Sequence, residues 1–303
     1  MNSMTEFFAA LRKSAPEIES AENEPLSNHT SFRIGGPAAV FAKPKTEAQL
    51  RTLLNLAGRF GIRPVILGAG TNVLAPDEGL DTLVICTRGC LGGIRRAGET
   101  GLEAGAGVTL TQLANFACEA GLAGLEFAHG IPGTVGGGAV MNAGAYGGEL
   151  ADVQTCTSGV RQDGRAWRCE GAEQGFGYRK SAFARGGVIV TRAEYRLTPD
   201  DPAAIRARMN ELFEKRRASQ PLDVPSAGSA FKRPAGAYAA ALIDKAGLKG
   251  TRVGGAAVSE KHAGFLINAG GATAEDVKAL IKLVQERVFE ASGIRLEPEI
   301  RIL

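Results

Sequence analysis

The chain has 303 residues, enough for about two domains of ~150 residues each. Hydrophobic residues make up 44% of it and charged residues 22%, as in folded globular proteins, which excludes wholesale disorder. The net charge of +3 is small, and the longest basic cluster, Lys215-Arg216-Arg217, is a short run near the end of an expected helix. We therefore expect no nucleic-acid partner.

The cysteines and the N-terminus indicate the compartment. The chain holds five cysteines, an odd number without a Cys-x-x-Cys pair, which argues against a disulfide framework and a zinc ribbon. The first residues are too acidic and too interrupted for a signal peptide, and no apolar run approaches the ~18 residues of a membrane span. We expect a cytoplasmic protein that binds no membrane and no metal and is a monomer or a weak homo-oligomer.

The N-terminal part of the chain predicts alternating helices and strands. Residues 1–26 indicate a short helix followed by a polar connector. Apolar spacing and the glycines that interrupt it then predict a strand near Phe41, a helix over 47–60, strands over 64–67 and 82–86, and a helix over 110–120.

The middle of the chain is less regular. Residues 125–148 contain too much glycine for a regular helix or strand, so we expect an irregular segment there. Residues 153–197 predict short strands, including 188–190 and 194–197. The acidic turn at 199–202, bracketed by prolines, is the expected domain boundary.

The C-terminal part predicts helices with one apolar face. The first begins after the acidic turn and carries Ile205, Met209, Leu212 and Phe213 at helical spacing. The elements expected beyond Pro225 are a helix ending at Gly247, a strand over 264–268, a helix over 274–292 between a Thr273/Asp276 cap and Gly293, and an extended edge over 294–303.

Glycine is the compositional outlier, with 41 of 303 residues against a usual ~7%. The segment 68–72 follows an expected strand, as a phosphate loop would, but Val73 breaks the Gly-x-Gly-x-x-Gly fingerprint. Its main-chain N–H groups and the Thr71 hydroxyl could bind a pyrophosphate; the alternative is an ordinary tight turn. A second cluster over 130–138, followed by Asn142, favours a long, phosphate-bearing ligand lined by main chain.

Hydrolytic chemistry finds little support. The chain lacks the Gly-x-Ser-x-Gly string of a nucleophile elbow, since Gly228-Ser229 is followed by Ala230-Phe231. A Ser/His/Asp triad assembled from distant segments stays open at this point.

Several motifs occur in an order that resembles the UDP-N-acetylenolpyruvoylglucosamine reductase family, and the resemblance covers nearly everything from Asn28 to Leu303. The matching strings are Asn28-His-Thr-Ser-Phe-Arg-Ile-Gly-Gly-Pro37, Leu67-Gly-Ala-Gly-Thr-Asn72, Gly130-Ile-Pro-Gly-Thr-Val-Gly-Gly137, Met141-Asn-Ala-Gly-Ala-Tyr-Gly147, Gly177-Tyr-Arg-Lys-Ser181, Gly228-Ser-Ala-Phe-Lys232 and Glu297-Pro-Glu-Ile-Arg301.

This resemblance implies an α+β fold in which a two-lobed FAD-binding domain of the vanillyl-alcohol oxidase type precedes a C-terminal α+β substrate-binding domain. The expected divisions are an N-terminal helix and connector over 1–26, the FAD-binding domain over 27–199 with lobes of about 27–90 and 91–199, and the substrate domain over 200–303. The residues expected to bind FAD are Leu67, Gly68, Ala69, Gly70, Thr71, Asn72, Gly130, Ile131, Pro132, Gly133, Thr134, Gly137, Asn142, Ala143 and Gly144.

The resemblance also implies the reaction. NADPH reduces the bound FAD, and UDP-N-acetylglucosamine enolpyruvate then accepts hydride at its β-carbon to become UDP-N-acetylmuramate, a precursor of peptidoglycan. Arg179 and Glu299 match the family's residues that stabilise the developing charge, and Ser229 matches its proton donor. From the residues alone, Arg179 could be a surface arginine, Ser229 a turn residue and Glu299 a solvated face, and the choice between Glu297 and Glu299 rests on motif alignment.

Further side chains are candidates for the substrate. Lys232 and Arg233 are expected to bind the UDP diphosphate, Lys261 and His262 are similar candidates, and Tyr178 could stack on the substrate or simply pack. Residues 177–183 lack the insertion that carries a covering tyrosine in longer members, which resembles a short subclass. Two rivals stay open: an FAD oxidoreductase of the same fold with another substrate, and a nucleotide-sugar binding protein without catalysis.

Overall fold

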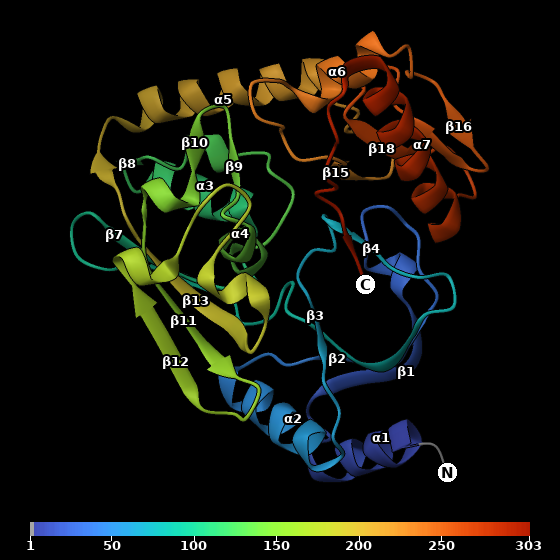
Figure 1. Ribbon diagram of the computed structural model, residues 1–303. Coiled ribbons are helices and arrows are strands. Elements are labelled where there is room, and N and C mark those ends of the chain that lie inside the picture. Colours follow the sequence, from blue (N-terminus) through green and yellow to red (C-terminus); the bar gives the residue numbers. More distant parts are fainter. Residues whose placement is uncertain (1–2) are drawn as a thin grey trace. The chain divides into compact units, whose positions relative to one another are not determined.

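The computed structural model describes residues 3–303, apart from the side chain of Arg185 (Figure 1). Its α-helices are α1 (Ser3–Ser14), α2 (Glu47–Arg59), α3 (Leu110–Glu119), α4 (Val135–Met141), α5 (Pro202–Ser219), α6 (Ala239–Lys245) and α7 (Ala274–Ser292). Among the helices of these residues, none is long and apolar enough to cross a membrane.

The larger sheets each gather strands from distant parts of the sequence. The first has the order β1-β2-β5-β3, with β1 (Glu19–Pro25), β2 (Pro37–Lys43), β5 (Leu80–Cys86) and β3 (Val65–Leu67). The second has the order β12-β11-β13-β7-β6, with β12 (Ala166–Glu170), β11 (Gln154–Arg161), β13 (Val188–Arg196), β7 (Gly101–Gly105) and β6 (Ile94–Arg96). The third has the order β15-β18-β17-β16, with β15 (Ser226–Ser229), β18 (Phe265–Asn268), β17 (Ala256–Val258) and β16 (Arg252–Val253).

Short strand pairs complete the fold. Strand β10 pairs with β9, β14 pairs with β8, and β19 lies parallel to β4. Their bounds are β4 (Val73–Leu74), β8 (Leu122–Ala123), β9 (Gly144–Ala145), β10 (Gly148–Glu149), β14 (Thr198–Pro199) and β19 (Arg301–Ile302).

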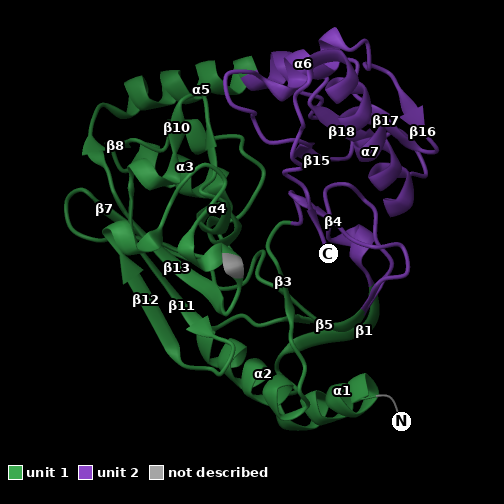
Figure 2. Ribbon diagram, viewed as in Figure 1, with its two compact units in different colours: residues 1–24, 39–69, 81–215 green, residues 25–38, 70–80, 216–303 purple. Residues whose placement is uncertain are grey.

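The chain forms two compact units (Figure 2). Unit 1 comprises residues 1–24, 39–69 and 81–215, and unit 2 comprises 25–38, 70–80 and 216–303. Two N-terminal segments therefore group with the C-terminal third of the chain, a grouping that the expected boundary at 199–202 does not anticipate. The division into functional domains stays a prediction.

The first lobe of unit 1 packs helices α1 and α2 beside each other against the sheet that holds β2 and β5 (Figure 1). Helix α2 begins at Thr46, whose side chain accepts a hydrogen bond from the Gln49 N–H at 3.2 Å, and it buries Leu50 and Leu53 at helical spacing. The predicted helix over 47–60 is thus confirmed. The expected polar connector is wrong in part, because strand β1 forms there and takes the sheet edge next to β2.

The second lobe of unit 1 is built on an antiparallel sheet. Strands β11 and β13 lie at its centre, and β13 continues on its other side to β7. Strand β13 is one continuous element of nine residues, whereas we expected short separate strands at its two ends. Pairing with β11 on one side and β7 on the other holds this strand together.

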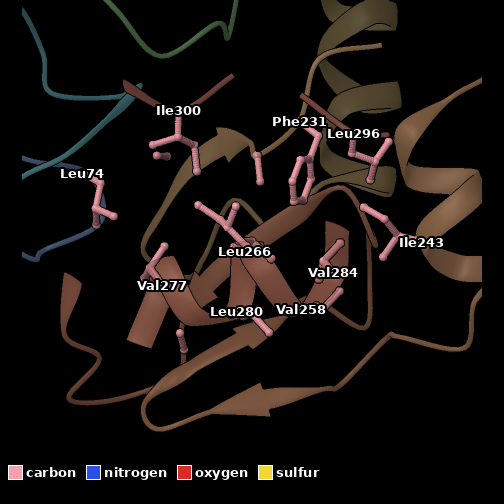
Figure 3. Packing of buried hydrophobic residues seen from close by; sticks show 14 of the residues in the cluster. Leu74, Phe231, Ile243, Val258, Leu266, Val277, Leu280, Val284, Leu296 and Ile300 are labelled. Carbon is pink, nitrogen blue, oxygen red and sulfur yellow. The ribbon is translucent and has the colours of Figure 1, made fainter. Parts of the chain in front are cut away.

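Unit 2 has its own apolar core between its sheet and helix α7 (Figure 3). Val277, Leu280 and Val284 follow one face of α7 and are fully buried. The predicted cap is confirmed, because Thr273 and Asp276 form a capping box and Gly293 ends the helix in the left-handed region at φ 70°.

The 70–80 segment is tied to α7. Both carboxylate oxygens of Asp77 accept from the Ala274 N–H at 2.8 Å, and one accepts from the Glu275 N–H at 3.3 Å. A carboxylate at a helix N-terminus is favoured by the helix dipole. This contact helps to explain why 70–80 belongs with a helix some two hundred residues later in the chain.

The C-terminal segment is more than the expected extended edge. Ile300 is buried in the unit 2 core, as Figure 3 shows, and Phe231 forms an isolated antiparallel bridge with Pro298. The last residues then pair with β4. The segment is therefore held on both sides by partners that local periodicity does not reveal.

Candidate active site

The two glycine-rich loops approach each other within unit 1. A Cβ atom on Gly68 would lie 2.7 Å from the Thr134 side-chain oxygen, well inside van der Waals contact. Thr134 is buried and caps helix α4, accepting a hydrogen bond from the Gly137 N–H at 3.3 Å. The absence of a side chain at residue 68 is therefore what lets the loop after β3 lie against the start of α4.

Both loops present unused main-chain donors. Among the described residues, the N–H groups of Gly68 and Ala69 have no hydrogen-bond partner, nor do those of Gly133 and Thr134. Successive unpaired N–H groups form an anion-binding concavity, the feature that a dinucleotide pyrophosphate needs. The expectation that both loops serve one phosphate-bearing ligand agrees with this geometry.

We expected an irregular segment over residues 125–148, and this expectation is wrong in part, because helix α4 forms there from Val135 to Met141. A Cβ on Gly136 would lie 2.9 Å from the Ala106 side chain, and one on Gly138 about 3.1 Å from Leu150. Close packing on both faces therefore requires glycine, and tertiary contacts override its poor helix propensity. The N–H groups of Val135 and Gly136 donate to main-chain carbonyls, so the free donors lie just before the helix.

The other predicted cofactor residues lie in the same two segments or in unit 2. Gly130 donates its N–H to the Thr111 hydroxyl at 3.2 Å, and Ala143 donates to the Gly138 carbonyl at 2.9 Å. Of the remaining predicted residues, Leu67 ends β3 and is buried, while Ile131, Pro132 and Gly144 are at least partly exposed.

Residues 70–72 belong to unit 2. Gly70 is buried with φ 63°, and a Cβ there would lie 2.0 Å from the His29 carbonyl oxygen, so only glycine fits. The side-chain amide of Asn72 donates to the Glu299 carbonyl at 3.2 Å, and Thr71 between them is partly exposed. In unit 2 the phosphate-loop motif is therefore joined directly to the C-terminal motif.

Arg179 lies in a tight turn of unit 1. Gly177 and Lys180 exchange main-chain hydrogen bonds of 3.1 and 3.0 Å, and Arg179 at the third position has φ 52°, where glycine is usual. A left-handed arginine costs about 1 kcal/mol, and such strain concentrates at functional sites. Its guanidinium donates to the Gly144 carbonyl at 3.3 Å and lies 5.0 Å from the centre of the half-exposed Tyr178 ring.

The Asn142 side chain is fully buried and bonded within the chain. Its amide nitrogen donates to the Gly177 carbonyl at 3.1 Å, and its amide oxygen accepts from the Ala151 N–H at 2.9 Å. Both hydrogen bonds of this side chain are therefore made inside the protein, and the expected contact between Asn142 and the cofactor stays a prediction.

Unit 2 places the segment that follows Ser229 against the C-terminal segment that contains Glu299. The Glu299 N–H donates to the Ala230 carbonyl and the Lys232 N–H to the Glu297 carbonyl, both at 2.8 Å. This antiparallel register sets Glu299 opposite Ala230, the residue after Ser229, and Glu297 opposite Lys232. Ser229 ends β15 and is exposed, and Glu299 is partly exposed. Glu297 is exposed and forms an ion pair with Lys232, and the choice of Glu299 over Glu297 stays a prediction.

The predicted phosphate-binding cations of unit 2 all have protein partners. Besides the Lys232 ion pair, Arg233 lies over the Tyr238 ring at 3.9 Å, a cation–π contact. The Lys261 ammonium donates to the Arg217 carbonyl at 2.7 Å.

His262 is partly buried and held by its neighbours. Its Nδ1 accepts from the Gly264 N–H at 3.2 Å, and its ring packs edge-on against Phe265 at 4.9 Å between centroids. Burial is the main cause that lowers the pKa of this imidazole below 6.5. The positive charge of Lys249 lowers the pKa further, by a smaller amount. At neutral pH His262 therefore offers a hydrogen bond rather than a positive charge.

A separate cavity of about 400 Å³ lies elsewhere in unit 1. Its charged lining residues are Lys45, Glu47, Arg95, Glu103 and Arg192, and it contains none of the predicted site residues. Arg192 and Arg95 both pair with Glu103, so these charges largely neutralise one another. The five cysteines are buried and free, as expected for a protein without a disulfide framework.

Comparison with known proteins agrees with these features. Residues 37–170 match the model of an FAD-binding domain, and residues 220–303 match the model of the UDP-N-acetylenolpyruvoylglucosamine reductase C-terminal domain. The chain is 44% identical over 302 residues to UDP-N-acetylenolpyruvoylglucosamine reductase 2 of Symbiobacterium thermophilum, covering 100% of this chain and 97% of the relative. It is 46% identical over 282 residues to the Rubrobacter xylanophilus reductase, covering 93% and 94%.

The fold agrees as well. The crystal structure of UDP-N-acetylenolpyruvylglucosamine reductase from Thermus caldophilus matches with a TM-score of 0.78 at 36% identity, over 94% of this chain and 98% of that one. An FAD-binding domain followed by a reductase C-terminal domain defines an FAD-dependent oxidoreductase, and the predicted α+β fold class is confirmed. The chain belongs to the UDP-N-acetylenolpyruvoylglucosamine reductase family.

FAD fits the residues present. The cradle between Gly68 and Thr134, with unused N–H groups on both sides, is what a pyrophosphate requires. Sequence reasoning missed what holds Arg179, namely the Gly144 carbonyl and the Asn142 amide, although both residues lie in a quoted motif. The motif contains Asn142, but the role of its amide becomes visible only through its hydrogen bond to Gly177, which lies 35 residues later in the chain.

Proposed function

We propose that this chain reduces UDP-N-acetylglucosamine enolpyruvate to UDP-N-acetylmuramate in peptidoglycan precursor synthesis, with electrons from NADPH. The observation that carries the proposal is family membership over the whole chain, together with the antiparallel contact in unit 2 between the segment that follows Ser229 and the segment that contains Glu299. FAD, held by the main-chain N–H groups of the loops at Gly68 and Thr134, would supply the hydride-transfer chemistry that links NADPH to the β-carbon of the enolpyruvyl group.

Arg179 and Glu299 act on the charge that this addition creates. A hydride at the β-carbon leaves an electron pair on the α-carbon, delocalised into the carboxylate. A cation beside that carboxylate stabilises charge that develops only in the transition state, which is the role of Arg179. The left-handed backbone conformation of Arg179 supports this role, because such strained conformations concentrate at functional sites.

Ser229 completes the reaction by giving its hydroxyl proton to the α-carbon. A serine hydroxyl is a weak acid toward water but adequate toward a carbanion within hydrogen-bond reach. Its exposure at the end of β15 lets solvent return the proton afterwards. The hydride and the proton together convert the enolpyruvyl ether into a lactyl ether.

The remaining candidates bind the sugar nucleotide. Lys232 and Arg233 bind the diphosphate, which requires Lys232 to exchange Glu297 for phosphate oxygens. Lys261 and His262 contribute hydrogen bonds, and Tyr178 packs against the substrate. The lack of the tyrosine insertion supports a place in the short subclass, with NADPH as the donor.

The test compares Ser229→Ala with Ser226→Ala, a matched change on the same strand. In Ser229→Ala we expect flavin reduction by NADPH to stay within about twofold of the parent, while product formation falls by about 10² to 10⁴. Ser226→Ala should keep both rates. Unchanged product formation in Ser229→Ala would overturn the mechanism.

The same assays separate the rivals. NADPH consumption that ignores the enolpyruvyl sugar nucleotide would favour a different FAD oxidoreductase of the same fold. Tight binding of the sugar nucleotide without turnover would favour a binding protein.

A further inference from the structure

Asn142 occupies the C-terminal cap of α4 in a conformation that few residues tolerate. Its φ and ψ are 44° and 62°, in the left-handed region where asparagine and glycine are favoured, and its side chain is fully buried. A polar side chain in such a position must find partners inside the protein.

The partners fix the orientation of the amide. The nitrogen donates to the Gly177 carbonyl, and the oxygen accepts from the Ala151 N–H. A reversed amide would set oxygen against a carbonyl and nitrogen against an N–H, so only one orientation makes both bonds. The side chain thus links two segments that pass on either side of it.

One of these segments is the turn that carries Arg179. Gly177 opens the turn, and Ser181 just beyond it donates its hydroxyl to the Val140 carbonyl at 2.8 Å. The turn is therefore held on the last turn of α4 at both ends. Without these bonds, the left-handed conformation of Arg179 would be free to relax.

The guanidinium of Arg179 also contacts the chain segment that begins at Asn142. Its guanidinium donates to the carbonyl of Gly144, which lies two residues after Asn142. From these contacts we infer that Asn142 is a positioning residue for Arg179: one buried amide holds both the backbone that carries the guanidinium and the chain segment that receives it. The inference rests on the proposed role of Arg179.

Two substitutions test the amide without straining the backbone. Asn142→Gly keeps the left-handed conformation and removes both side-chain bonds, whereas Asn142→Asp keeps the acceptor for Ala151 and loses the donor to Gly177. Asn23→Gly is the matched control, because exposed Asn23 has φ 53° in the same unit.

The first readout is amide hydrogen exchange in the FAD-loaded full-length protein. We expect exchange in the segment 175–183 to become at least about tenfold faster in Asn142→Gly and to stay unchanged in Asn23→Gly. This measurement does not depend on turnover. Unchanged exchange in both Asn142 variants would overturn the inference.

The second readout separates the half-reactions. In both Asn142 variants we expect normal flavin content and flavin reduction by NADPH within about twofold, with oxidation by the enolpyruvyl sugar nucleotide about 10- to 100-fold slower. Loss of FAD from both variants would show that Asn142 holds the cofactor rather than Arg179, and would also overturn the inference.

A double-mutant cycle identifies the partner. If Asn142 acts through Arg179, then Asn142→Gly adds no further loss of sugar-nucleotide reduction in an Arg179→Ala background. Additive losses would refute the positioning role while leaving the catalytic role of Arg179 intact. An Arg179→Ala variant that reduces the sugar nucleotide normally would instead refute the proposed function itself.

Discussion

The close approach of Gly68 to Thr134 makes a Gly68→Ala substitution a sharp test of the flavin cradle. The added Cβ would lie 2.7 Å from the Thr134 hydroxyl oxygen, which is buried and caps α4. The hydroxyl must therefore move and release the Gly137 N–H. Loss of such a cap costs about 1 kcal/mol, and overpacking a buried contact costs about 1–3 kcal/mol.

The expected outcome has two parts. The free energy of unfolding, from urea denaturation of the apoprotein, should fall by about 1–3 kcal/mol in Gly68→Ala. Affinity for FAD, from quenching of flavin fluorescence, should weaken about tenfold or more, because the loop donors shift with the added atom. The control is Gly58→Ala on the exposed face of α2, where a Cβ meets nothing within 4 Å and should stabilise the protein by about 0.5–1 kcal/mol.

A second-site change identifies the clash. Thr134→Gly leaves an acceptable cap at a cost of a few tenths of a kcal/mol and removes the oxygen that Gly68→Ala would strike. The double variant should therefore bind FAD better than Gly68→Ala alone. If Gly68→Ala binds FAD like the parent, or if Thr134→Gly rescues nothing, the two loops do not form one cradle.

Other contacts give further tests. Asp77→Ala removes the acceptor for the Ala274 and Glu275 N–H groups and should cost about 1 kcal/mol of unfolding free energy in chemical denaturation, whereas no change would show that solvent replaces it. Tyr195→Phe should be neutral or stabilising in the same assay, because the buried Tyr195 hydroxyl has no partner in the described residues; a large loss would contradict this. Since burial lowers the pKa of His262, the unfolded chain binds more protons below pH 6.5, and the stability from the neutral imidazole is lost as the pH falls through the folded pKa. Denaturation between pH 7 and about 5 should show a smaller loss of stability in His262→Gln than in the parent, and parallel profiles would refute this.

Helices with local signals were predictable from the sequence. The 274–292 helix has the bounds that its Thr273 cap and terminal Gly293 predict, and the 47–60 helix differs by one residue. In both, the cap, the apolar spacing and the terminating residue lie within one stretch of chain. The information is local, so a local pattern is sufficient.

Elements that depend on distant partners were not predictable in this way. Strand β1 is polar and acidic, and only its pairing with β2 makes it a strand. Likewise, the grouping of 70–80 with unit 2 depends on Asp77 reaching α7, and no periodicity within 70–80 carries that information. An edge strand, or a helix cap supplied by a distant segment of the same chain, forms only when its partner segment is in place.

The site shows the same division for a chemical reason. Motif alignment selects residues that share one function, and here it selects the loops at Gly68 and Gly133, which approach each other, and the segments of Ser229 and Glu299, which pair through Ala230. Alignment does not distinguish a residue that contacts a ligand from a residue that positions the contacting residue, because both kinds occur in the motif. Asn142 is the instructive case: an amide in a glycine-rich stretch suggests a ligand, yet its hydrogen bonds are inside the protein.

Within these two loops glycine serves two distinct purposes, and we connect only one of them with the cofactor. Gly68 and Gly133 expose main-chain donors, which a side chain would hinder, whereas Gly136 and Gly138 let a short helix pack against Ala106 and Leu150. Alanine at the helical positions should therefore lower stability while leaving the donors in place, and alanine at residue 68 should weaken FAD binding as well. A glycine cluster in this fold marks a ligand only where its N–H groups remain unpaired.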